Sequence, residues 1–179
     1  AVPFIIEQVK GKGRKQEQQF EYLSEFHQFM QWRRSDAILL GEANVLPGEM
    51  MPYFGDQGDR VQMMFNFFVN QHLFYALASG DTAPLQSALK QTKRIPGTSQ
   101  WAQFLRNHDE LDLGRLKPQQ RAAVFERFGP TREMQLYDRG IRRRLASMLG
   151  DRRHIELANS VMFSLPGAPV IRYGDEIGM

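Results

Sequence analysis

The sequence has 179 residues, of which 42% are hydrophobic and 11% aromatic, so it is long and apolar enough to bury the core of one domain. Its 23 basic and 20 acidic residues leave a formal net charge of +3, and it contains no cysteine. This small and mixed charge does not indicate a nucleic-acid partner. The absence of thiols excludes disulfides, thiolate metal sites and a cysteine nucleophile.

No apolar run approaches the roughly 20 residues that cross a bilayer, so we expect no membrane partner. Residues 1–6 lack the basic start and the cleavage-type end of a signal peptide, which makes the cytoplasm the expected location. Basic residues cluster in two places, as they do on many solvated loops and helix faces: Lys10, Lys12, Arg14 and Lys15, and Arg142, Arg143, Arg144, Arg152 and Arg153.

The first predicted elements are a helix and a strand. Apolar residues recur at helical spacing over residues 20–34: Phe20, Leu23, Phe26 and Met30. We expect this largely aromatic stripe to pack in the core. Residues 37–41 read Ala-Ile-Leu-Leu-Gly and predict a strand buried on both faces, which ends at the carboxylate of Glu42.

A polar loop rich in Pro and Gly is predicted over residues 45–60. Loops of this length inside a compact domain are usually functional or mobile. Its apolar side chains either contact a substrate or pack against one another: Met50, Met51, Tyr53 and Phe54. A buried strand is expected at residues 61–68, followed by a helix at 70–79 that ends at Gly80.

Further alternation of helices and strands is expected in the rest of the chain. Asp81 or Thr82 caps a helix that runs to about Lys93, and a strand at residues 101–106 ends in Asn107-His108-Asp109-Glu110. Residues 112–139 are expected to be an insertion with one short helix, and two more helices and a strand follow. The helix of the insertion is predicted at residues 118–128. The next helix contains Ile141, Leu145, Met148 and Leu149 and ends at Gly150, Asp151 caps the helix after it, and the strand is predicted at 168–173.

This order predicts an α/β fold with a parallel sheet and right-handed crossovers. Acidic residues follow three of the expected strands, at Glu42, at Asp109 and at Asp175. Since the reactive side chains of such folds lie beyond the carboxyl ends of the strands, we expect these acids to share one rim. The chain is short for a complete eight-stranded barrel, which takes about 250 residues.

Converging carboxylates suit the hydrolysis or transfer of glycosides, in which one acid protonates the leaving oxygen while another attacks or stabilises an oxocarbenium-like centre. The four histidines show no metal-ligand spacing, and the sequence has no nucleophile elbow, phosphate loop or dinucleotide motif. Taken alone, Asn107-His108-Asp109 is equally well explained as a turn that caps its own loop.

These motifs resemble those of the α-amylase superfamily of glycoside hydrolases (family 13). Leu40-Gly-Glu-Ala-Asn44 is similar to the strand-five motif of that family, and Phe104-Leu-Arg-Asn-His-Asp-Glu110 to its strand-seven motif. The resemblance implies that Glu42 is the general acid/base, that Asp109 stabilises the transition state, and that His108 and Asn107 bind the sugar. Residues 164–178 are similar to the strand-eight segment, whose acidic pair is mostly architectural.

Within the superfamily, the sequence most resembles the trehalose synthase subgroup. The residues that carry this resemblance are Asn107-His-Asp-Glu-Leu111, Gly140-Ile-Arg-Arg-Arg-Leu-Ala146 and Asp151-Arg-Arg153. It implies maltose and trehalose as the small-molecule partners and the conversion of one into the other by glucosyl transfer. The alternatives left open are an α-glucosidase or amylase-type hydrolase and a non-catalytic sugar-binding scaffold.

The resemblance also implies that residues 1–179 are the second half of a (β/α)8 TIM barrel, strands five to eight with their helices, with loop insertions at about 45–60 and 112–139 and no complete second domain. The nucleophilic aspartate of the family would immediately precede Ala1. We therefore expect the chain alone to be inactive, and its open edges to favour self-association. The chemistry needs no cofactor. Some family members bind a structural Ca²⁺, for which Asp56 and Asp59 are candidate ligands.

Overall fold

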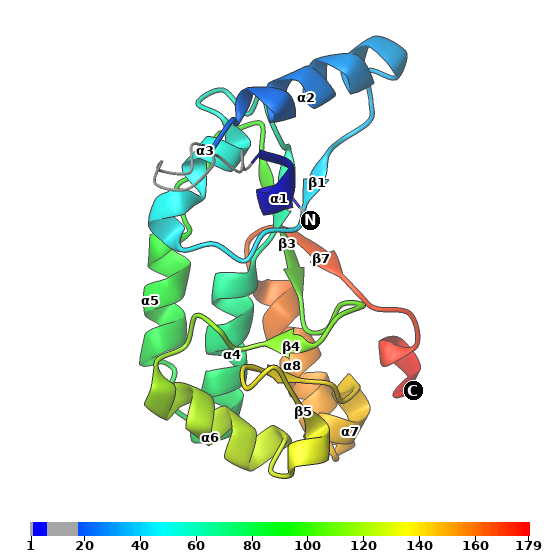
Figure 1. Cartoon of the computed structure of the whole chain (residues 1–179). Helices are drawn as coiled ribbons and strands as arrows, with labels where there is room; N and C mark the ends of the chain where they lie inside the picture. The colour runs from blue at the N-terminus through cyan, green and yellow to red at the C-terminus, as the bar shows by residue number, and fades with distance from the viewer. Residues whose placement is uncertain (1, 7–17) are drawn as a thin grey trace. The chain divides into compact units, whose positions relative to one another are not determined.

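The computed structural model describes residues 2–6 and 18–179, which form two compact units (Figure 1). The first unit extends to Phe65 and also contains Arg94–Trp101. The second unit contains Asn66–Lys93 and Ala102–Met179. The basic cluster at residues 10–15 lies outside the described residues.

The first unit contains a short parallel strand pair with helices before and between the strands. β1 (Leu40–Gly41) pairs with β2 (Met63–Phe65), with Leu40 opposite Met63. The N–H of Gln100, the first residue of β3 (Gln100–Phe104), donates to the carbonyl of Gln62 at 2.9 Å. The helices of this unit are α1 (Val2–Ile6), α2 (Glu21–Arg33), the 3₁₀ helix η1 (Pro47–Glu49) and α3 (Met51–Phe54).

The predicted loop at 45–60 is partly helical. Met50, Tyr53 and Phe54 are buried. The Phe54 ring meets Trp101 edge to face at a centroid distance of 5.1 Å, and Tyr53 meets Phe20 in the same way at 5.1 Å. Tyr53 and Phe54 therefore pack against residues outside the loop, whereas Met51 is 38% exposed.

Two expectations for the first unit were wrong. The strand predicted at 37–41 forms only at Leu40–Gly41 and is not buried on both faces, because Ile38 is 55% exposed and Leu40 45% exposed. The predicted helix is present as α2, but its stripe is not wholly in the core: Leu23 is buried whereas Phe26 is 47% exposed. Helical spacing shows which residues share a face but not whether another element covers that face.

The second unit is built around the buried helix α4 (Phe67–Ser79), which packs against α5 (Ala83–Gln91) and α6 (Pro118–Phe128) (Figure 1). β3 pairs in parallel with β7 (Ala168–Val170), with Ala102 opposite Ala168. The other helices of this unit are α7 (Leu145–Leu149), α8 (Arg152–Ser164) and the 3₁₀ helices η2 (Arg132–Met134) and η3 (Asp175–Ile177).

Local signals set most helix ends in this unit. Asn66 ends the strand predicted at 61–68 early, because its side-chain oxygen accepts the Val69 N–H at 3.1 Å and so caps α4. Gly80 ends α4 with a left-handed φ of 76°, as expected. Asp151 caps α8 by accepting the Arg153 N–H at 2.8 Å, also as expected.

The predicted insertion at 112–139 contains the expected helix, α6, but also belongs to a sheet that the sequence did not predict. β4 (Leu111–Asp112), β6 (Gly140–Ile141) and β5 (Gln135–Leu136) form a three-stranded antiparallel sheet in the order β4-β6-β5. Ile141 pairs with Leu111 in this sheet, so the prediction that Ile141 belongs to the helix was wrong. A two-residue strand is too short to produce a recognisable alternating pattern.

Candidate functional site

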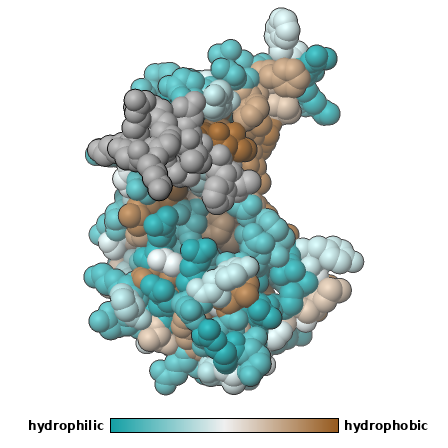
Figure 2. All heavy atoms as spheres, in the orientation of Figure 1, coloured by the Kyte–Doolittle hydropathy of each residue, from teal (hydrophilic) through white to brown (hydrophobic). Residues whose placement is uncertain are grey.

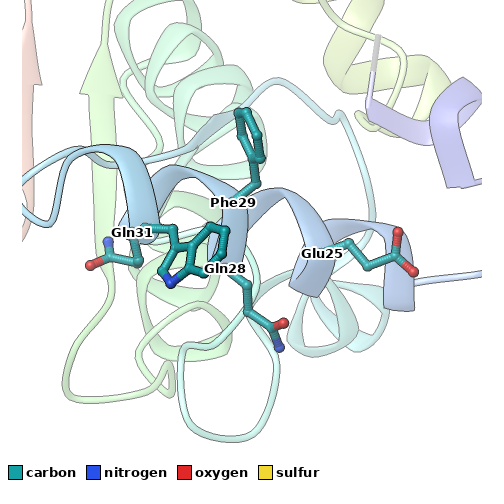
Figure 3. Close-up of a pocket in the computed structure, with 5 residues that line it drawn as sticks. Glu25, Gln28, Phe29 and Gln31 are labelled. Atoms are coloured by element: carbon teal, nitrogen blue, oxygen red, sulfur yellow. The ribbon is translucent and has the colours of Figure 1, made fainter.

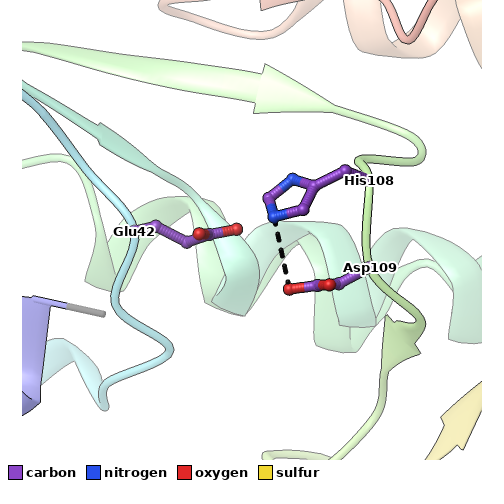
Figure 4. Close-up of side chains that lie close together, drawn as sticks. All are labelled: Glu42, His108 and Asp109. Atoms are coloured by element: carbon purple, nitrogen blue, oxygen red, sulfur yellow. Dashed lines mark ion pairs between the residues drawn. The ribbon is translucent and has the colours of Figure 1, made fainter.

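Glu42 follows β1 in the first unit, at the carboxyl end of the strand as predicted. The strands approach closely here, since a Cβ atom on Gly41 would lie 3.3 Å from Cγ of Met64. Glu42 is half-buried and Asn44 is also half-buried. Figure 4 shows the Glu42 side chain on the segment that leaves the strand.

Asn107, His108 and Asp109 form a turn beyond β3 in the second unit. Nε2 of His108 lies 3.4 Å from Oδ2 of Asp109, and both side chains are largely exposed (Figure 4). Asn107 is buried, and its side-chain oxygen accepts the Asp109 N–H at 3.1 Å. The turn thus exposes an imidazole and a carboxylate to solvent, and the buried Asn107 side chain stabilises the turn through its hydrogen bond to the Asp109 N–H.

Asn70 fixes the end of β3 from α4. Its side-chain nitrogen donates to the carbonyls of Phe104 at 2.6 Å and Leu105 at 3.1 Å, and it is only 3% exposed. A buried amide that satisfies two carbonyl groups holds the backbone just before the turn without introducing charge. No local pattern in the sequence indicates that Asn70 would bind these two carbonyl groups, because they lie more than 30 residues further along the chain.

Asp175 does not have the environment of a catalytic acid. It is buried, and its Oδ1 lies 2.8 Å from Nη2 and 3.2 Å from Nε of Arg144. The same Nη2 donates to the carbonyl of Tyr173 at 2.8 Å. An acid engaged by a guanidinium in this way joins the segment after β7 to the start of α7, which agrees with the architectural role expected for it.

The Ca²⁺ ligands proposed from sequence do not form a site by themselves. Asp56 and Asp59 are exposed, and within the described part of the chain neither belongs to a group of three or more converging His, Asp or Glu side chains. Because Ca²⁺ takes six to eight oxygen ligands, this pair does not fit the ion.

A shallow depression on α2 is lined by residues of that one helix (Figure 3): Glu25, Gln28, Phe29, Gln31 and Trp32. Phe29 is 56% exposed and Trp32 is 91% exposed. A single helix does not enclose a ligand, and none of these five residues was predicted to be catalytic or to bind the sugar. The depression is therefore an exposed apolar face and not a second candidate site.

No helix among the residues that the structure describes is both long and apolar enough to span a membrane. No family model matches the sequence.

Curated relatives match the chain over its whole length. Trehalose synthase from Thermus thermophilus is 39% identical over 181 residues, which are 100% of this chain and 19% of that protein. Throughout its length, the chain is similar to trehalose synthases. Trehalose synthase/amylase TreS from Mycolicibacterium smegmatis is 39% identical over 190 residues, and trehalose synthase from Pimelobacter sp. is 36% identical over 188. The chain covers 31% and 33% of these two proteins, so it spans between a fifth and a third of these trehalose synthases.

The fold is shared with a solved structure of the expected superfamily. A crystal structure of α-amylase from H. orenii matches 90% of this chain and 27% of its own chain, with a TM-score of 0.62 and 22% sequence identity. At this identity the match informs on fold alone. It confirms the predicted α/β fold and agrees with part of a TIM barrel, and the parallel pairs β1-β2 and β3-β7 are of the kind that such a barrel requires.

Proposed function

We propose that this protein acts on α-glucosides and converts maltose into trehalose by intramolecular glucosyl transfer. The observation that carries the proposal is the 39% identity with a trehalose synthase over every residue of the chain. The turn at Asn107–Asp109 supplies an exposed carboxylate and imidazole beyond a parallel strand, as this chemistry needs.

Each predicted residue has one role in this mechanism. Glu42 protonates the oxygen that leaves the anomeric carbon and later removes a proton from the acceptor hydroxyl. Asp109 stabilises the positive charge that develops on the sugar ring. His108 and Asn107 position the sugar, and the exposed His108 is the direct contact in this scheme.

A retaining reaction needs a second carboxylate about 5 Å from the acid, which attacks the anomeric carbon and forms the covalent intermediate. By the resemblance to the α-amylase superfamily, this nucleophile is an aspartate. The reaction therefore needs this aspartate together with Glu42, and we expect a protein that contains both to be active.

The second candidate function is hydrolysis of the same α-glucosides. It is favoured by the name of the M. smegmatis relative, trehalose synthase/amylase. Transfer and hydrolysis share the same glucosyl intermediate and differ in whether water reaches it. A non-catalytic sugar-binding scaffold is the third possibility.

The test is proton NMR of maltose incubated with the full-length protein. We expect the anomeric signal of trehalose to exceed those of free glucose. Glu42→Gln should lower the rate about 10²- to 10⁴-fold, the usual contribution of a general acid/base. Glu49→Gln makes the same charge change at an exposed residue whose carboxylate accepts the Leu46 N–H, and it should leave the rate unchanged.

Glucose as the main product would establish hydrolysis and would contradict the proposed conversion of maltose into trehalose. Unchanged maltose with the full-length protein would favour the binding scaffold.

A further inference from the structure

Arg106 is a charged residue at a position where the neighbouring sequence is apolar. It follows Phe104 and Leu105 beyond β3, directly precedes Asn107, and is only 2% exposed. Burying a cation typically costs several kcal/mol, and apolar residues of similar volume often give a more stable protein. A guanidinium at this position therefore suggests a role other than stability.

The guanidinium has one hydrogen bond to a neighbouring segment. Its Nε donates to the carbonyl of Arg143 at 3.1 Å. Its Nη1 is buried and makes no hydrogen bond to any residue that the structure describes. Burial, with a smaller effect from Arg172, lowers the pKa of Arg106 to about 10, so the group keeps its charge at neutral pH.

The carboxylates that act on this charge belong to Asp175 and Glu110. Asp175 is already engaged by Arg144, whereas Glu110 is the residue on the far side of the turn. Arg106 and Glu110 therefore bracket Asn107–Asp109 in the sequence with opposite charges, and the contact that fixes the Arg106 side chain is its bond to the Arg143 carbonyl.

Gly140 shows that the position of Glu110 is fixed by packing. A Cβ atom on Gly140 would lie 2.5 Å from Cγ of Glu110 and 3.3 Å from the carbonyl oxygen of Leu136. The Glu110 side chain thus lies directly against the backbone of β6. Glu110 is therefore held against β6, and Arg106 is tied to Arg143, which lies two residues after β6. Both ends of the turn are anchored on the same segment.

We propose that Arg106 is a positioning residue: its side chain is anchored on the Arg143 carbonyl just after β6, Glu110 packs against β6, and the turn between them, which carries His108 and Asp109, is thereby held closed. The proposal rests on the proposed function, in which Asp109 stabilises the transition state. Arg106 does not touch the sugar. It acts through the turn, where a small displacement of a catalytic carboxylate lowers the rate.

The test is hydrogen–deuterium exchange of the full-length protein, read by mass spectrometry at the Asp109 amide. This amide donates to the Asn107 side chain at 3.1 Å, and the proposal predicts that opening of the turn breaks this bond. In Arg106→Met it should exchange about tenfold faster or more, the size expected for losing a hydrogen bond that involves a charged group. Amides inside α4, such as that of Asn70, should keep their protection. Arg106→Lys keeps the charge and should restore most of the protection.

Two further variants distinguish a local effect on the turn from a general destabilisation of the protein. Arg143→Met keeps the carbonyl that Arg106 uses but loses the side-chain bonds to the carbonyls of Phe128 and Ser147, so exchange at Asp109 should not change. Glu110→Gln removes the opposing charge at nearly constant shape and should accelerate exchange at Asp109 in the same direction as Arg106→Met.

Normal protection of the Asp109 amide in a folded Arg106→Met protein would overturn the proposal, and so would equal loss of protection throughout α4 or failure of Arg106→Lys to restore it. In enzyme kinetics, we expect Arg106→Met to lower kcat and to leave KM nearly unchanged, because Asp109 acts in the transition state.

If the wild-type protein does not act on maltose, the proposed function fails, whereas the exchange result still decides the role of Arg106.

Discussion

At the scale of single residues, three asparagines hold the backbone around the turn. Asn66 caps α4, Asn70 binds the carbonyls of Phe104 and Leu105, and Asn107 accepts the Asp109 N–H. All three are buried, and each makes a hydrogen bond to a backbone group. Only the first and last act within three residues of themselves, so only these had a local signal in the sequence.

His72 on α4 makes the stability of the second unit depend on pH. Its Nδ1 lies 2.7 Å from the carbonyl of Phe68 and must carry the proton, since a carbonyl only accepts. Burial lowers the pKa of His72 below its ordinary value of 6.5, although the hydrogen bond to Phe68 acts in the opposite direction. The folded state therefore binds the second proton, which charges the ring, less readily than the unfolded state does.

We expect the free energy of unfolding to fall as the pH drops below about 6.5 and to continue falling until the folded-state pKa is reached. His72→Gln removes the titrating group and should make the urea midpoint depend less on pH over this range. His154→Gln replaces an exposed histidine and serves as the control. Equal pH dependence in wild type and His72→Gln would show that other groups cause the effect.

At the scale of elements, the helices that the sequence predicted well are those with signals at their own ends. α6 occupies the predicted range of 118–128, α4 ends at Gly80, and α8 begins after Asp151. The sheet of β4, β6 and β5 has no such signal, because its strands are two residues long and Leu111 pairs with Ile141, far along the chain.

The caps of α8 and α5 provide a matched test. Asp151 accepts the Arg153 N–H, whereas Thr82, the residue before α5, makes no side-chain capping bond. Asp151→Ala should lower the free energy of unfolding by about 1 kcal/mol, and Thr82→Ala should have a much smaller effect. Urea denaturation followed by circular dichroism measures both, and equal losses would mean that the Asp151 bond contributes nothing.

At the scale of the whole molecule, α2 carries an exposed apolar face, and a tan and brown patch lies among teal atoms near the top of Figure 2. Tyr22, Phe26, Phe29 and Trp32 are all exposed on this helix. Contiguous exposed apolar surface usually marks an interaction site or an aggregation hazard. The self-association expected of a half barrel therefore has a specific candidate surface in the first unit.

We expect the 179-residue chain to associate at micromolar concentration, and Phe29→Gln combined with Trp32→Gln to shift it toward monomer in sedimentation velocity. Tyr137→Gln replaces an aromatic that is 71% exposed on the β5–β6 turn of the second unit, and it should leave the association unchanged. A monomeric wild-type chain, or association that persists in the double variant, would contradict this expectation.

The sequence by itself determined the α/β class, the ends of the main helices and the turn that carries His108 and Asp109. These features depend on periodicity, caps and motifs, which act over a few neighbouring residues. Only the tertiary structure decided that the aromatic face of α2 is exposed, that β4 pairs with β6, that Asp175 is engaged by Arg144, and that Arg106 is buried behind the turn. Burial and pairing depend on which distant segments meet, and a local pattern of residues does not contain that information.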